Sequence, residues 1–98
     1  MVQTTEQKTE VKRRIRECRE NQHMALYLTD LGIHYVPDEV FTLTHLDTLH
    51  LRFNHLHTLP NAIANLHKLS YLNLGDNQFH TFPESITPLH NLTHLVLS

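Results

Sequence analysis

The histidines are the residues in this sequence whose number and spacing suggest chemistry. The 98 residues include 10 histidines and one cysteine, Cys18. Imidazole binds zinc, nickel and other transition metals, and it exchanges protons near neutral pH. Three of the histidines recur at an interval of 23 residues: His34, His57 and His80. In a repeating fold they would stack in one column, with neighbours about 5 Å apart.

This histidine column has the wrong shape for a metal site. A structural zinc ion needs four ligands at close range, whereas three stacked residues span about 10 Å. His55 could approach His57, but only from the opposite side of the chain. We therefore predict no metal site and no cofactor, and we expect the column to be exposed. Protonated imidazoles in a stack would repel one another, so stability should fall as the pH decreases through the histidine range.

No catalytic motif is recognisable in the chain. The two glycines, Gly32 and Gly75, are too few for a phosphate-binding loop, and neither G-x-S-x-G nor H-E-x-x-H occurs. The carboxylates are scattered rather than paired. Cys18 lies on the apolar side of a predicted helix, where a thiol is usually inert. We therefore predict that the chain is not an enzyme.

The charges divide the chain into a basic beginning and an acidic body. Six of the eight lysines and arginines lie in residues 8–19, whereas residues 21–98 carry two basic and six acidic side chains, a net charge of 2 − 6 = −4. This balance argues against a general nucleic-acid partner. No secretory signal and no apolar run of membrane-spanning length occur, and a single cysteine cannot form an internal disulfide. These features predict a cytoplasmic protein without a membrane partner.

A 23-residue repeat organises most of the sequence. Residues 46–68 match residues 69–91 with ten identities in 23 positions. A degenerate copy occupies residues 23–45, and a partial fourth copy occupies residues 92–98. The shared pattern is L-x-x-L-x-L-x-x-N-x-L-x-x-L-P-x-x-I-x-x-L-x-x. A period of this length predicts a solenoid, in which stacked copies bury one continuous leucine core.

On these columns, residues 23–98 resemble the leucine-rich repeat family, and in particular its 23-residue L-P-x-x-I class of Ras-suppressor-like, Scribble-like and Roco-like proteins. The resemblance implies an α/β solenoid, with a short parallel sheet on the concave face and short helical turns on the convex side. It also implies that Asn54 and Asn77 hold the turn after each strand through their side-chain amides. The proline of each copy is expected at the first helical position.

The segment before the repeats, residues 1–22, is predicted to be a polar tail and a capping helix over residues 5–20. Thr4 and Gln7 have the spacing of a weak capping box. An apolar stripe would cover the exposed core of the first repeat. The stripe consists of Val11, Ile15 and Cys18. The basic residues alternate with glutamates, which favours a solvated face, although contact with acidic lipid or nucleic acid is the alternative.

The partial fourth copy leaves leucines and a strand edge without a following repeat in the sequence. Its apolar residues are Leu92, Leu95 and Leu97. An unpaired strand edge readily associates with another chain. We interpret the chain as a piece of a longer repeat array or as a truncated relative, and self-association through this edge is the alternative.

Seven residues are predicted to form a partner-binding surface on the concave face. Six of them occupy outward-facing strand positions, since side chains alternate between the two faces of a strand, and Phe53 occupies the column that follows. The set is Tyr27, His50, Arg52, Phe53, Tyr71, Asn73 and His94. Aromatic and arginine side chains are enriched in binding hot spots, although these residues could simply cover the sheet. We predict a non-catalytic module, such as a signalling scaffold, that binds another protein. The resemblance also allows the targeting fragment of a larger enzyme, such as a Roco-type GTPase or a bacterial effector ubiquitin ligase.

Overall fold

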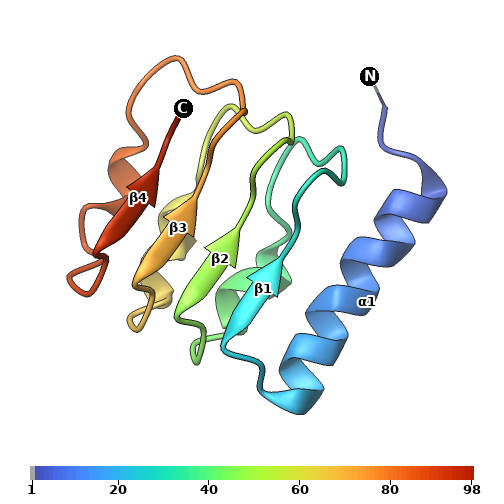
Figure 1. Ribbon diagram of the computed structural model, residues 1–98, viewed down its shortest axis with the longest axis horizontal. Coiled ribbons are helices and arrows are strands. Elements are labelled where there is room, and N and C mark those ends of the chain that lie inside the picture. The colour runs from blue at the N-terminus through green and yellow to red at the C-terminus, as the bar shows by residue number, and fades with distance from the viewer. Residues whose placement is uncertain (1) are drawn as a thin grey trace.

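Four short parallel strands form one sheet along one face of the molecule (Figure 1). The computed structural model describes residues 2–98. The strands are β1 (Ala25–Tyr27), β2 (Thr48–His50), β3 (Tyr71–Asn73) and β4 (His94–Val96), in the spatial order β1-β2-β3-β4. Each residue pairs with the residue 23 positions later, as Leu49 does with Leu72. The sequence period is therefore the register of the sheet.

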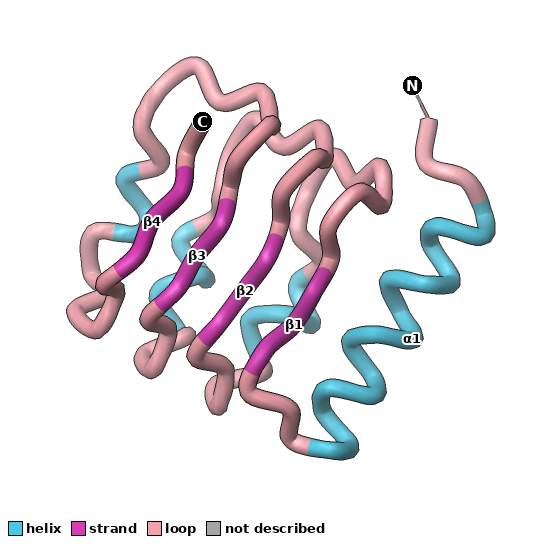
Figure 2. Tube along the Cα trace, viewed as in Figure 1, coloured by secondary structure: helices cyan, strands magenta, loops and turns pink. Residues whose placement is uncertain are grey.

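Three short 3-10 helices form a second layer on the other side of the leucine core, behind the strands in Figure 2. They are η1 (Asp38–Thr42), η2 (Asn61–Asn65) and η3 (Glu84–Ile86). A proline precedes each helix, and its carbonyl oxygen accepts the first helical hydrogen bond, as Pro60 does from the N–H of Ile63 at 3.1 Å. The expectation of proline at the first helical position was wrong by one residue, because proline takes the cap position instead.

The leucines of the repeat lie between the two layers. Leu49, Leu51 and Leu72 are fully buried, and the other leucines of the central copies are nearly or fully buried. A fully buried leucine contributes about 2 kcal/mol relative to an exposed one. The predicted leucine-rich solenoid is therefore confirmed, with a continuous core shared by consecutive copies.

The helix α1 (Thr5–Asn21) lies beside β1 and covers that end of the core (Figure 1). The N–H of Gln7 donates to Thr4 Oγ1 at 3.0 Å, and the N–H of Thr4 donates to Gln7 Oε1 at 2.9 Å, so the capping box is complete. The stripe of Val11, Ile15 and Cys18 is buried. Among residues 2–98, no helix has the length and apolar character needed to span a membrane.

Two of the six basic residues of α1 form ion pairs within the helix itself. Arg13 pairs with Glu10 and Glu17, and Arg14 Nε donates to Glu10 at 2.7 Å. The guanidinium groups of Arg13 and Arg14 lower the pKa of Glu10 to about 2. These arginines therefore already have acidic partners.

Candidate functional site

Four aromatic rings form a continuous row across the outward face of the sheet. We call this the ring row; it consists of Tyr27, His50, Tyr71 and His94. The ring centroids are 4.6 Å apart from Tyr27 to His50, 5.0 Å from His50 to Tyr71, and 6.2 Å from Tyr71 to His94. The row therefore crosses all four strands, and it gathers four of the seven residues predicted to bind a partner.

The ring row combines two outward columns of the repeat. Tyr27 pairs in register with His50, and Tyr71 pairs in register with His94. His50, however, lies opposite Asn73 in the sheet, so its contact with Tyr71 is diagonal. Diagonal neighbours on one face of a sheet are within reach of aromatic side chains. This diagonal contact joins two pairs of rings into one surface.

Stacking determines what the ring row can offer to a partner. The planes of Tyr27 and His50 are inclined by only 15°, so their faces are turned towards each other. Burial lowers the pKa of His50 and so favours its neutral imidazole, which has one donor and one acceptor nitrogen. Rings held in a stack lose little conformational freedom when a partner binds. The row is therefore a rigid surface that carries hydroxyl and imidazole groups.

Arg52 and Phe53 continue this surface beyond the end of β2. Arg52 Nε donates to the carboxylate of Asp76 at 2.8 Å, and the guanidinium carbon lies 4.8 Å from the centroid of the Phe53 ring. Phe53 is 50% exposed. An arginine above an aromatic ring is favourable because the ring face carries partial negative charge.

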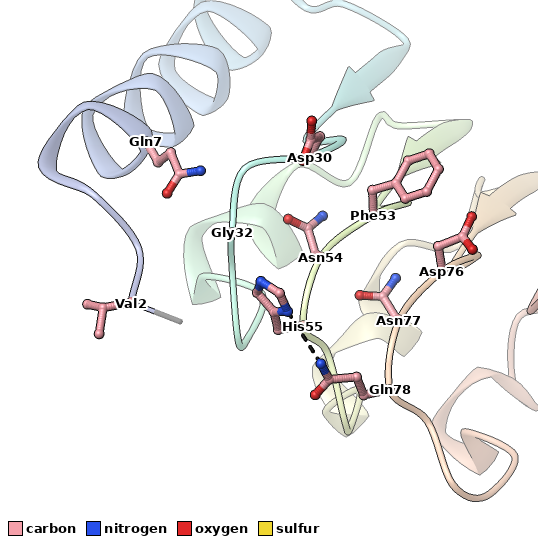
Figure 3. A pocket seen from close by; sticks show the side chains of 10 residues that line it. All are labelled: Val2, Gln7, Asp30, Gly32, Phe53, Asn54, His55, Asp76, Asn77 and Gln78. Atoms are coloured by element: carbon pink, nitrogen blue, oxygen red, sulfur yellow. Dashed lines mark hydrogen bonds between the residues drawn. The ribbon is translucent and has the colours of Figure 1, made fainter.

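An open hollow of about 550 Å³ lies beyond the carboxyl-terminal ends of the strands, where the residues that follow the strands come together (Figure 3). Asp30, Phe53 and Asp76 occupy one column of the repeat along it. Its other lining residues are Val2, Gln7, Gly32, Asn54, His55, Asn77 and Gln78. Sequence reasoning did not include Asp30 and Asp76 in the site, although their 23-residue register with Phe53 could have indicated them.

The backbone of this column adopts a left-handed conformation in three consecutive copies. The φ angles are +55° at Asp30, +57° at Phe53 and +53° at Asp76. Aspartate tolerates this region, whereas a bulky residue rarely adopts it. Strain of this kind costs on the order of 1 kcal/mol and is concentrated at functional sites. Phe53 is therefore an exposed aromatic residue at a position that does not favour its side chain.

Asn73 does not belong to the exposed surface, and this part of the prediction was wrong. Its side chain is 7% exposed. The N–H of Gly75 donates to Asn73 Oδ1 at 2.9 Å. Gly75 occupies the next outward position and has no side chain, so the amide of Asn73 lies close against its backbone.

The histidine rings pair differently from the expected column of three. Among residues 2–98, ring contacts join His34 to His55 at 5.0 Å and His57 to His80 at 6.5 Å. Within the same residues, no group of three or more His, Cys, Asp or Glu side chains could hold a metal ion.

A second groove, of about 920 Å³, lies between α1 and the loop that precedes η1. Val11, Ile15 and Ile33 are among its apolar lining residues. Lysines from α1 and acidic residues from η1 also line it, so the groove has no dominant charge. They are Lys8, Lys12, Asp38 and Glu39.

Comparison with known proteins agrees with the repeat architecture. A leucine-rich repeat family model matches residues 24–79 and 44–98. A leucine-rich repeat protein of Leptospira interrogans, LIC12759, has a similar solved structure, with 36% sequence identity and a TM-score of 0.64. The match covers 68% of this chain but only 17% of that protein's chain, so this chain spans a small part of its length. A search of curated proteins found no match.

The family match extends across all four strands, and the fold shows the parallel sheet, the convex turns and the shared leucine core of such repeats. The chain belongs to the leucine-rich repeat family.

Proposed function

We propose that this chain is a non-catalytic interaction module that binds another protein through the outward face of its sheet, within the 23-residue class of leucine-rich repeats. The observation that carries the proposal is Phe53, which is half exposed in a left-handed backbone conformation beside the ring row. A strained aromatic residue contributes little to folding at such a position, whereas a rigid exposed ring suits a binding hot spot.

Several further observations support this proposal. Leucine-rich repeat domains generally bind proteins. The ring row and Arg52 supply the tyrosine and arginine types that dominate binding hot spots. Cys18 is buried and unpaired, which suits the reducing environment of the cytoplasm. The scaffold role in signalling is part of the same proposal.

A random peptide library, selected on the immobilised chain, provides binders for a direct test. The Phe53→Ala/Tyr71→Ala variant should weaken the selected peptides about tenfold, since hot-spot residues contribute energies of this size. The matched control is Tyr35→Ala/Phe82→Ala, which also removes one tyrosine and one phenylalanine. Tyr35 is exposed, and Phe82 is 51% exposed, close to the 50% of Phe53. Peptides that are weakened by the control and unaffected by the first variant would place the binding surface elsewhere.

A second candidate is a targeting segment within a larger protein, with a Roco-type GTPase or an effector ubiquitin ligase as possible enzymes. The observation that favours it is the small share, 17%, of the Leptospira protein that this chain covers. Extending the reading frame of the coding sequence tests it: a catalytic domain downstream would support this candidate, and a stop codon after Ser98 would contradict it.

Self-association through β4 is the remaining proposal for a partner. Among residues 2–98, β4 has a strand neighbour on one side only, and Leu97 beyond it is exposed. Light scattering over a concentration series measures the molar mass. A dimer that Leu95→Lys abolishes would support pairing through this edge, whereas a monomer at all concentrations would exclude it.

A further inference from the structure

One guanidinium group of the chain itself already contacts a ring and a carboxylate that line the hollow. Arg52 donates to the carboxylate of Asp76 at 2.8 Å and lies 4.8 Å from the centre of the Phe53 ring. Arg52 and Phe53 come from one copy of the repeat, and Asp76 comes from the next. An aromatic ring and a carboxylate in consecutive copies therefore bind a guanidinium beyond the carboxyl-terminal ends of the strands.

One copy earlier, the corresponding positions also provide a ring and a carboxylate but no arginine, and the ring and the carboxylate have exchanged places between the two copies. Asp30 occupies the position of Phe53, and Thr29 occupies the position of Arg52. The N–H of Asp30 donates to the backbone oxygen of Arg52 at 3.0 Å, so the two copies are adjacent here. Asp30 and Phe53 both line the hollow, where Figure 3 labels them, and they provide a second carboxylate and ring there.

Among residues 2–98, no cation pairs with the carboxylate of Asp30. No hydrogen bond or ion pair of this side chain occurs among residues 2–98, and Asp30 is exposed. Nearby cations already have partners: Arg14 pairs with Glu10, and Arg52 pairs with Asp76. Residues 21–98 carry a net charge of 2 − 6 = −4, which attracts cationic groups.

We infer that the hollow binds an arginine side chain of the partner protein, with its guanidinium between the ring of Phe53 and the carboxylate of Asp30. The inference rests on the proposed protein-binding function and specifies the chemistry of the partner. Arginine fits better than lysine because its planar group stacks on a ring while its N–H groups donate to a carboxylate. The bound arginine would contact one ring and one carboxylate, as Arg52 does in the next copy, but with the ring and the carboxylate exchanged between the copies.

The first test is an NMR titration of the isotopically labelled chain with N-acetyl-arginine amide. We expect saturable chemical-shift changes confined to the amides near Asp30 and Phe53. N-acetyl-lysine amide should bind more weakly, and the uncharged N-acetyl-citrulline amide should bind weakest, because it lacks the cation. Equal shifts with the citrulline compound, or shifts spread over the whole chain, would overturn the inference.

Two substitutions complete this test without removing an apolar side chain. Asp30→Asn should weaken binding of N-acetyl-arginine amide about threefold, as expected for a partly exposed ion pair, whereas the matched control Asp38→Asn should leave it unchanged. Thr29→Arg should abolish binding, because the new side chain would lie against Asp30 and Phe53 as Arg52 lies against Phe53 and Asp76. Undiminished binding by both the Asp30→Asn and the Thr29→Arg variants would refute the site.

The same variants separate this inference from the proposed function. Peptides selected from the random library depend on Phe53 and Tyr71 if the sheet face binds proteins. If those peptides are unaffected by Asp30→Asn and Thr29→Arg, the binding face stands and the arginine site is refuted. If they are also unaffected by Phe53→Ala/Tyr71→Ala, both proposals are refuted.

Discussion

Asn54 Nδ2 donates a hydrogen bond of 2.9 Å to the backbone oxygen of Leu28, which lies in the preceding copy of the repeat. Asn54 Oδ1 accepts from the N–H groups of Leu31 at 3.0 Å and Ile33 at 3.2 Å. The side chain is only 4% exposed. One amide therefore satisfies buried backbone groups of two adjacent copies, and these groups would otherwise lose their hydrogen bonds.

We predict that Asn54→Ala lowers the free energy of unfolding by about 3 kcal/mol, because it leaves several buried polar groups unpaired. Urea denaturation followed by circular dichroism measures this loss. Asn77→Ala should lower the free energy of unfolding by less, because Asn77 is partly exposed. Its Oδ1 accepts from the N–H of Leu56 at 3.0 Å, whereas Asn54 Oδ1 accepts from two N–H groups. Asn61→Ala, on the exposed convex side, serves as the control and should change stability little. Equal losses for Asn54→Ala and Asn61→Ala would contradict this account.

The features predicted correctly from the sequence are those that every copy of the repeat enforces. The leucine columns predict the sheet register because each strand must bury the same face as its neighbour. The capping box at Thr4 depends on two residues three positions apart, so it is visible in a short stretch of sequence.

One error in the outward-facing positions involves a glycine in one copy of the repeat. Asn73 folds against the bare backbone of Gly75, and it is buried instead of exposed. The ring of His34 stacks on His55, a contact between two different columns of the repeat. A periodic pattern averages over such local differences between copies.

The backbone conformation at Phe53 predicts an unusual order of stability. We expect Phe53→Gly to be more stable than Phe53→Ala by about 1 kcal/mol, because glycine adopts positive φ without strain. At ordinary positions the order is the reverse. Thermal unfolding of the two variants measures the difference, and the same pair of substitutions at His57, whose φ is not positive, is the control. If alanine is the more stable residue at both positions, Phe53 is not strained.

The burial of His50 predicts a loss of stability at low pH. Burial lowers the pKa of this imidazole below its ordinary value of 6.5, and the rings of Tyr27 and Tyr71 lie on its two sides. Below about pH 6.5 the unfolded chain therefore binds more protons than the folded chain, so stability falls as the pH decreases.

The melting temperature between pH 7.5 and pH 5.5 tests this prediction. The decrease should be smaller in His50→Gln, which cannot be protonated, than in the unmodified chain. His67→Gln, at an exposed convex position, should retain the full decrease. An identical pH dependence in His50→Gln and the unmodified chain would show that another group is responsible.

The alkylation rate of Cys18 measures how often the capping helix α1 separates from the repeats. Its thiol is buried, and Cys18 Sγ donates to the backbone oxygen of His23 at 3.4 Å. Burial raises the pKa of the thiol, and only the thiolate reacts with alkylating reagents. We therefore predict very slow alkylation of the folded chain and rapid alkylation in urea. Fast modification of the folded chain would mean that α1 does not stay docked.

The N-terminal cap should control this rate. Thr4→Ala removes the capping box, a loss of about 1 kcal/mol, and should accelerate the alkylation of Cys18 roughly fivefold because the helix opens more often. Thr44→Ala, at an exposed position in the first repeat, should leave the rate unchanged. If Thr4→Ala lowers the free energy of unfolding without accelerating alkylation, opening of α1 by itself does not expose Cys18.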